Sequence, residues 1–496
     1  MTPAAMAPHD AAEKQFFGHP RGLSTLFFTE MWERFSYYGM RGLLVLFLVN
    51  ALETGGMGMT DGTAAAIYGM YTAGVYLFAL PGGWMADRLL GKRQAVFIGG
   101  IIIAAGHFSM AVPSETFFFL GLILIVLGTG LLKPNVSAIV GDLYPDGGAR
   151  RDAGFSLFYM GINIGALLGP LLVGYLGETI SWHLGFSAAG IGMILGLIQY
   201  KLGEKYLGSA GLLSEEARET RGAAWKTFFM GIGVVGVLAA VLYGLSSTGT
   251  LALTLEGAAA ATGVIIVSLA IVYFVAALLF FGLDGDEKKR VALIFILFIG
   301  SALFWSGFEQ AGSSMNLFAE RLTDRVIFGW EAPASWLQSI NPLFIILLAP
   351  VAGTLWVRLG DRDPSIATKF GIGLALLGIG FLVLAWASVS ASDTNRVTPV
   401  WLVMTYFLHT CGELALSPVG LSSVTKLSPP RLVGQMMGIW FMGTALGNLI
   451  AGLVAGQFER LPLVQLFGAV GALAIGSGLI FLVLRVPISR LAGDVH

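Results

Sequence analysis

Long apolar segments, separated by short runs of charged residues, glycine and proline, recur along the whole chain. Each is about as long as a helix needs to cross the hydrocarbon core of a bilayer, which takes about 20 residues. The pattern predicts fourteen membrane-spanning helices, near residues 23–50, 63–87, 94–112, 116–138, 153–176, 182–202, 226–246, 258–282, 291–315, 333–357, 368–390, 399–424, 433–456 and 463–486.

The composition supports an all-α integral membrane protein. Hydrophobic residues make up 56% of the chain and charged residues 12%, whereas soluble domains have about 45–50% and 25%. The charges are spread over loops, which disfavours nucleic-acid binding. No spacing matches a metal site, a phosphate-binding loop or an activated nucleophile, so we expect neither an enzyme nor a cofactor.

The basic residues are distributed unevenly between the two sets of loops. An even number of spans places both termini on one side, and the loops of the other side contain only Arg321, Arg325, Arg396 and Arg460. By the positive-inside rule, both termini are expected to be cytoplasmic, in a multi-pass protein of the cytoplasmic membrane.

The first predicted span contains the sequence E-M-W-E-R-F-S-Y-Y-G-M-R at residues 30–41. Its polar residues recur every three or four positions and therefore share one broad face of a helix. A charge at the centre of a single spanning helix costs about 2.5–3.5 kcal/mol on insertion scales. We therefore expect this face to line a polar pathway through a bundle.

Three other charged residues lie well inside predicted spans: Lys133, Glu309 and Glu413. With the first-span charges they could form pairs that exchange partners, because a buried pair is tolerable and a single buried charge is not. The alternative is a fixed salt-bridge network that only holds helices together. Aromatic, amide and hydroxyl residues in other spans complete a candidate cavity, namely Tyr76, Tyr159, Asn163, Trp305, Asn341, Ser417 and Trp440. Singly, such aromatic residues are more often core or interface residues.

Two connections look alike, G-G-W-M-A-D-R-L-L-G-K-R at residues 82–93 and G-T-L-W-V-R-L-G-D-R at residues 353–362. The first resembles the loop signature of the major facilitator superfamily, and the second resembles its degenerate partner; the alternative for the second is an ordinary cytoplasmic loop, since such loops collect Asp, Arg and Gly. The resemblance implies two six-helix bundles, with two additional helices between them. The expected organisation is a tail at 1–22, a bundle at 23–202, a linker with two helices at 203–290, a bundle at 291–486 and a tail at 487–496.

Three motifs resemble those of the proton-dependent oligopeptide transporter family, a branch of that superfamily. E-x-x-E-R-F-x-Y-Y-G is present at residues 30–39, F-Y-x-x-I-N-x-G-x-L at 158–167, and G-E-L-A-L-S-P-V-G at 412–420 is similar to the tenth-helix motif. The resemblance implies a proton-coupled symporter that imports di- and tripeptides by alternating access, in contact with lipid and without an obligate protein partner. A transporter of another solute, such as nitrate or an amino-acid-like compound, is the alternative, and a non-transporting peptide receptor is a remote one.

The family resemblance also implies roles for individual residues. The peptide ammonium would face Glu413, near Asn163 and Asn341. The carboxylate would face Arg34 and Lys133, supported by Tyr37 and Tyr76, with Tyr38 also among the substrate-binding residues, and the side chains would rest among Tyr159, Trp305, Ser417 and Trp440. Proton coupling is attributed to Glu30, Glu33 and Glu309, with an outer gate between Arg41 and Glu309 and an inner gate involving Lys133 and Glu413.

Overall fold

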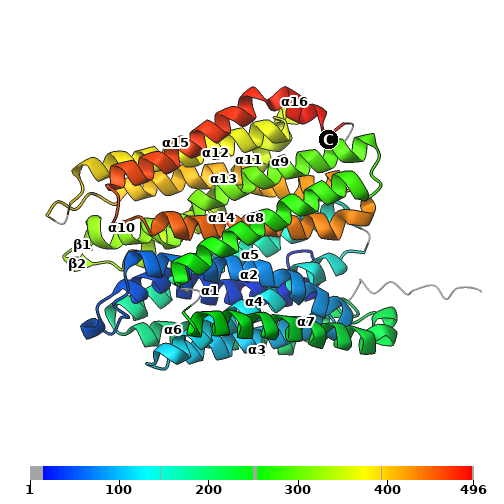
Figure 1. The fold of residues 1–496 in the computed structure, drawn as a ribbon, viewed down its shortest axis with the longest axis horizontal. Coiled ribbons are helices and arrows are strands. Elements are labelled where there is room, and N and C mark those ends of the chain that lie inside the picture. The colour runs from blue at the N-terminus through cyan, green and yellow to red at the C-terminus, as the bar shows by residue number, and fades with distance from the viewer. Residues whose placement is uncertain (1–14, 146, 250–253, 393, 494–496) are drawn as a thin grey trace, which may run out of the picture.

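The computed structural model describes residues 15–145, 147–249, 254–392 and 394–493. Long helices run side by side through the molecule (Figure 1). They are α1 (Gly22–Val49), α2 (Asp61–Met85), α3 (Lys92–Met110), α4 (Glu115–Asp142), α5 (Gly148–Thr179), α6 (Trp182–Gly203), α7 (Glu215–Ser247), α8 (Leu255–Phe280), α9 (Gly285–Phe308), α11 (Ile340–Leu359), α12 (Ile366–Ser390), α13 (Val400–Leu427), α14 (Val433–Ala455) and α15 (Leu463–Val483).

Short elements connect or extend these helices. Two are α-helices, α10 (Ser314–Leu322) and α16 (Arg485–Arg490), and two are strands, β1 (Val326–Ile327) and β2 (Trp330–Glu331), which pair antiparallel. The others are short 3₁₀ helices, apart from the π-helical η2, namely η1 (Leu52–Thr54), η2 (Ala86–Leu90), η3 (Glu204–Leu207), η4 (Glu309–Gly312), η5 (Ala334–Ser339), η6 (Gly360–Arg362) and η7 (Pro430–Leu432). We call the face with β1, β2 and α10 the distal side, and the opposite face, where α1 begins and α16 lies, the terminal side (Figure 1).

The predicted all-α membrane fold is confirmed. In the described part of the chain, 12 helices are long and apolar enough to cross a membrane. The two remaining long helices, α1 and α13, have 28 residues each and pack in the same bundle, α1 against α5 and α6 and α13 against α12 and α11. Together they account for the fourteen predicted spans.

Helix boundaries differ from the prediction where capping residues extend a helix. The span predicted near 226 begins at Glu215, because the Ser214 side chain accepts a hydrogen bond from the Ala217 amide. The span predicted near 291 begins at Gly285, because Asp284 and Glu287 form a capping box. Such caps satisfy amide groups that the first helical turn leaves without partners.

The span predicted at 291–315 is not continuous. α9 ends at Phe308, a 3₁₀ turn follows at η4, and α10 resumes at Ser314. The sequence Gly312-Ser313-Ser314 has low helix propensity, and Ser314 bonds to the Gln310 side chain at 2.8 Å. This break places Glu309 at the end of a helix rather than within one.

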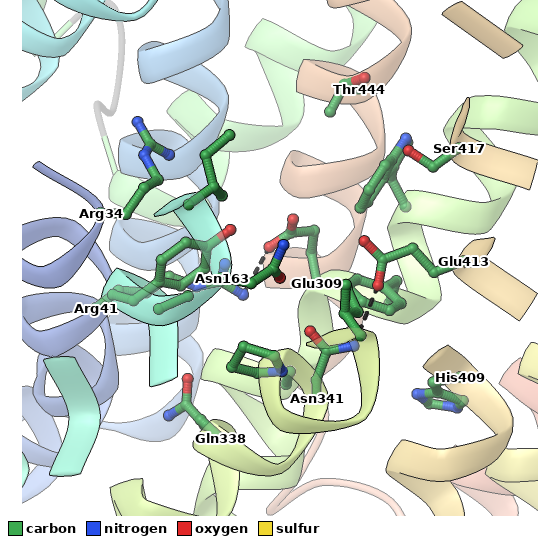
Figure 2. Close-up of a pocket in the computed structure, with 18 of the residues that line it drawn as sticks. Arg34, Arg41, Asn163, Glu309, Gln338, Asn341, His409, Glu413, Ser417 and Thr444 are labelled. Atoms are coloured by element: carbon green, nitrogen blue, oxygen red, sulfur yellow. Dashed lines mark hydrogen bonds and ion pairs between the residues drawn. The ribbon is translucent and has the colours of Figure 1, made fainter. Parts of the chain in front are cut away.

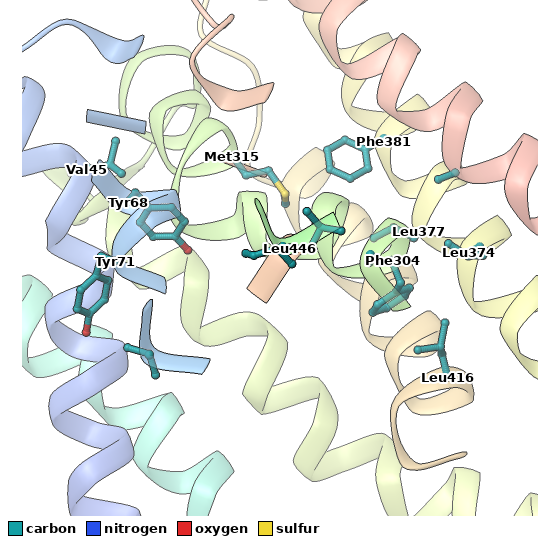
Figure 3. Packing of buried hydrophobic residues seen from close by; sticks show 14 of the residues in the cluster. Val45, Tyr68, Tyr71, Phe304, Met315, Leu374, Leu377, Phe381, Leu416 and Leu446 are labelled. Atoms are coloured by element: carbon teal, nitrogen blue, oxygen red, sulfur yellow. The ribbon is translucent and has the colours of Figure 1, made fainter. Parts of the chain in front are cut away.

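The helices pack as two groups that meet along two seams. We call α1 to α6 the first half and α9 to α15 the second half. In the first half α3 packs on α4 and α6, and in the second α12 packs on α13 and α15. The halves meet where α2 contacts α14 and where α5 contacts α11. At the first seam a Cβ built on Gly452 would lie 2.7 Å from the Cα of Gly69, so only glycine permits this approach. Buried side chains of both halves, including Tyr68 and Phe304, fill the centre (Figure 3).

The two additional helices lie at the edge of this bundle. α8 contacts α2, α14 and α9, whereas α7 contacts η2 at one end and exposes most of its apolar side chains. An exposed apolar helix of 33 residues suits a position in lipid.

Candidate functional site

A cavity of about 300 Å³ lies between the two halves. Most predicted site residues line it: Glu30, Arg34, Tyr38, Arg41, Tyr76, Lys133, Tyr159, Asn163, Trp305, Glu309, Asn341, Glu413, Ser417 and Trp440. They come from α1, α2, α4 and α5 on one side and from α9, η4, α11, α13 and α14 on the other. The fold therefore gathers residues from the whole chain into one space.

The α1 charges form a compact buried cluster. Arg34 Nε lies 3.2 Å from Glu30 Oε1, one helical turn away, and also bonds to the Glu33 carboxylate. Glu33 is fully buried and does not line the cavity, so Arg34 stands between it and the open space. Two acids next to one arginine keep that guanidinium in a fixed orientation and, when both are ionised, more than compensate its charge.

Lys133 lies on the same side of the cavity as Arg34. Its Nζ is 4.0 Å from the ring centroid of Tyr76, which is cation–π distance. Within the described residues, no ion pair joins Lys133 to Glu413. The pairing expected for an inner gate is therefore not formed in this conformation, because the two residues are held by other partners.

Glu413 lies on the opposite side (Figure 2). Asn341 Nδ2 donates to Glu413 Oε2 at 3.1 Å and lies 2.9 Å from Thr410 Oγ1. The carboxylate thus has a neutral neighbour and no cation of its own among the described contacts. A cationic group entering the cavity would find an available acceptor here.

An ion pair closes the cavity toward the distal side. Arg41 Nη2 lies 2.7 Å from Glu309 Oε2, so the pair expected for an outer gate is present (Figure 2). Arg41 belongs to the first half and Glu309 to the second. Both side chains are about 6% exposed, and a buried pair of this kind loses stability when either partner loses its charge.

Further contacts join the halves beyond this pair. Arg321 bonds to both carboxylate oxygens of Asp61 at 2.7 and 2.8 Å. Glu178, at the end of α5, accepts hydrogen bonds from the Ala334 amide at 2.7 Å, from the Ser335 amide at 3.0 Å and from the Ser335 hydroxyl. Together these contacts hold the distal side closed.

The position of Tyr37 differs from the prediction: its side chain does not line the cavity in this conformation. Successive helical positions point about 100° apart, and on α1 it is Tyr38 that faces the open space. The Tyr37 ring packs beside Tyr71 with centroids 6.2 Å apart. It still contacts Arg34, whose guanidinium carbon is 5.0 Å from its ring centroid.

Several lining residues were not predicted. They are Ile162, Ala166, Pro170, Phe308, Ala311, Gln338, Pro342, Ile345, Tyr406, His409, Phe441 and Thr444. Most are apolar or weakly polar and resemble ordinary packing residues in the sequence. Gln338 lies on η5, whose 3₁₀ geometry determines the direction of the side chain. No sequence signal distinguishes these positions from neighbouring ones.

This chain is similar to known proteins along most of its length. The family model described as POT family matches residues 93–473. The peptide transporter YePEPT of Yersinia enterocolitica is 43% identical over 97% of both chains, and a di-/tripeptide transporter of Lactococcus lactis subsp. cremoris is 38% identical over 98% of this chain and 99% of its own.

A solved structure shows the same similarity in three dimensions. The crystal structure of a peptide transporter POT in complex with sulfate superposes with a TM-score of 0.89, at 43% identity over 97% of each chain. The two full-length relatives extend the similarity to the α1 motif, which lies before the residues that the family model matches. This multi-pass membrane protein therefore belongs to the POT family.

Proposed function

We propose that this protein is a proton-coupled symporter that imports di- and tripeptides across the cytoplasmic membrane. The observation that carries the proposal is the separation of charge across one cavity. Arg34 and Lys133 lie on the first half and Glu413 on the second. A short peptide is a zwitterion with opposite charges at its ends, so this arrangement offers each end a counter-charge while tolerating varied side chains.

The charged groups at the two ends of the peptide define the proposed binding mode. The peptide carboxylate would bind Arg34 and Lys133, with Tyr38 and Tyr76 beside it, and the ammonium would bind Glu413. Asn163 and Asn341 would bond near the ammonium, and Tyr159, Trp305, Ser417 and Trp440 would surround the side chains. A volume of about 300 Å³ is at the small end of ligand cavities, which favours short peptides. The name of the Lactococcus relative, a di-/tripeptide transporter, supports the same ligand class.

The orientation rests on the positive-inside rule. The terminal side, where α1 begins and α16 lies, would be cytoplasmic, and the distal side would face outward. The present conformation would then be closed to the outside, because the pair of Arg41 with Glu309 and the Asp61–Arg321 pair join the halves there. Alternating access would move the bundle of 23–202 against that of 291–486, with the helices of 203–290 at their edge.

A proton is proposed as the coupling ion, without another cofactor. A proton on Glu309 removes the counter-charge of Arg41 and weakens the outer contact, which favours opening. Glu30 and Glu33 would handle protons beside the peptide carboxylate site through Arg34. One charge crossing a potential of 100 mV supplies about 2.3 kcal/mol.

The test is uptake by the purified protein in lipid vesicles. Vesicles that are acidic outside and negative inside should accumulate labelled dialanine and trialanine, and an uncoupler should abolish accumulation. Alanine, tetraalanine and nitrate serve as comparison solutes. Accumulation that persists with the uncoupler would contradict proton coupling, and preferential uptake of alanine or nitrate would contradict the peptide assignment.

A further inference from the structure

The phenol of Tyr68 lies at the centre of the contact between the two halves. Tyr68 is on α2 and is fully buried. Arg41 Nε donates to its hydroxyl oxygen at 2.7 Å, and the hydroxyl donates to the Glu309 backbone carbonyl at 3.1 Å. One oxygen therefore contacts both members of the Arg41–Glu309 pair, from a third helix.

The backbone break after α9 creates the acceptor that Tyr68 uses. The last carbonyl groups of an α-helix lack partners within the helix, and α9 ends at Phe308, so Glu309 lies where such a group is available. The site is also shaped for the tyrosine ring. A Cβ built on Gly312 would lie 2.7 Å from Tyr68 Cε2, so the glycine leaves the space that the ring occupies.

From these contacts we infer that Tyr68 is a positioning residue for the outer ion pair, and that it keeps Arg41 oriented when Glu309 is protonated. This inference rests on the proposed function, which assigns a proton to Glu309. Arg41 and Tyr68 both belong to the first half, so their hydrogen bond persists when the halves separate. The bond from Tyr68 to the Glu309 carbonyl crosses between the halves and must break.

Loss of the Tyr68 hydroxyl therefore affects the closed state and the open state differently. Without the hydroxyl, the closed state leaves a buried arginine N–H and a buried carbonyl without partners, and each unpaired group destabilises that state. The open state loses only the bond to Arg41. Removing the hydroxyl should therefore shift the equilibrium away from distal closure, by about tenfold.

Other groups also act on this pair and belong in any interpretation of pH dependence. The titratable and charged groups around Glu309 and Arg41 are Tyr37 and Tyr38 on α1, Tyr68, Tyr71 and Tyr76 on α2, and Tyr406 and Glu413 on α13. Tyr68 is the one that the described hydrogen bonds connect to both members of the pair.

The experiment uses Tyr68→Phe, which keeps the ring and removes the hydroxyl. Spin labels on cysteines at Glu53 and Phe328, in a Cys411→Ala background, report the distance between the halves on the distal side, where both positions are exposed. Tyr200→Phe is the matched control, because Tyr200 is also buried and donates to a backbone carbonyl, that of Arg93 at 3.2 Å, far from the cavity.

Tyr68→Phe should increase the population with long label distances about tenfold and shift the pH dependence of dialanine uptake, while Tyr200→Phe should match the parent. A double-mutant cycle with Glu309→Gln separates positioning from a general packing role: the two changes should be non-additive in the distance populations. Additive effects, or unchanged populations in Tyr68→Phe, would overturn the inference. The distance measurement needs no transport, so failure of the parent to take up peptide would instead contradict the proposed function.

Discussion

Asn341 and Glu413 form a hydrogen bond, at 3.1 Å between Nδ2 and Oε2, that links α11 to α13 inside the second half. The same amide lies 2.9 Å from Thr410 Oγ1. These contacts fix the carboxylate at the wall of the cavity opposite Arg34 (Figure 2). The position of Glu413 is thus set before any ligand enters, and binding would not have to order it.

Replacement of Glu413 by Gln should weaken peptides with a free ammonium group about 10- to 100-fold, because a charge-assisted hydrogen bond is lost. N-acetylated analogues should weaken much less, since they have no ammonium group to lose. Equilibrium binding of dialanine and N-acetyl-dialanine to the purified variant measures this difference. Ser477→Ala, on the outer helix α15, is the control. Equal weakening of both ligands would remove Glu413 from the ammonium site.

Replacement of Lys133 by Gln should act at the other end of the peptide. The ammonium that lies over Tyr76 is lost, and peptides with a free carboxylate should bind about 10-fold more weakly. Peptides with an amidated C-terminus should change little, because they carry no negative charge there. Competition binding with dialanine and its C-terminal amide measures the ratio. A similar loss for both would indicate that Lys133 supports the cavity without contacting the carboxylate.

Replacement of Glu309 by Gln should separate exchange from proton-driven accumulation. The amide can still bond to Arg41 but cannot exchange a proton, so the coupling step is lost while the cavity remains. Counterflow of labelled dialanine in vesicles should stay within about threefold of the parent, and proton-driven uptake should fall more than tenfold. Parallel losses in both assays would assign Glu309 to peptide binding instead.

Replacement of Glu178 by Ala tests distal closure independently of the ligand. Its carboxylate accepts hydrogen bonds from the amides of Ala334 and Ser335. Glu178→Ala would leave both amides without this partner, which should lower the free energy of unfolding by about 1–3 kcal/mol. On an isolated helix the same change would be favourable, because a negative charge at a helix C-terminus opposes the dipole. The sign of the change in unfolding free energy therefore shows whether Glu178 acts through the contact between the halves.

The measurement for Glu178→Ala is thermal unfolding in detergent, together with the distal label distances. The melting temperature should fall, and the long-distance population should rise. Thr179→Ala is the matched control, because the neighbouring threonine is exposed and its side chain, within the described part of the chain, bonds only to the Tyr175 carbonyl of its own helix. An unchanged or higher melting temperature for Glu178→Ala would show that its bonds to η5 do not stabilise the closed state.

The sequence was sufficient to locate the membrane-spanning helices, because the membrane imposes one rule on every span. Backbone groups in lipid must bond within the helix, so length and apolar composition determine where spans lie. Charged residues inside spans were visible for the same reason: they are rare there, and each one requires a partner.

Tertiary structure alone decided which residues meet. Nothing local distinguishes Tyr68 from Tyr71 on α2, yet only Tyr68 bonds to Arg41 and to the Glu309 carbonyl. The exclusion of Tyr37 from the cavity depends on how α1 is rotated against α2 and α5. Such contacts join residues up to 274 positions apart, and their geometry depends on how helices pack rather than on any local preference. The sequence by itself therefore determined the spans and the charges that need partners, while the packing of the halves decided which partners they have.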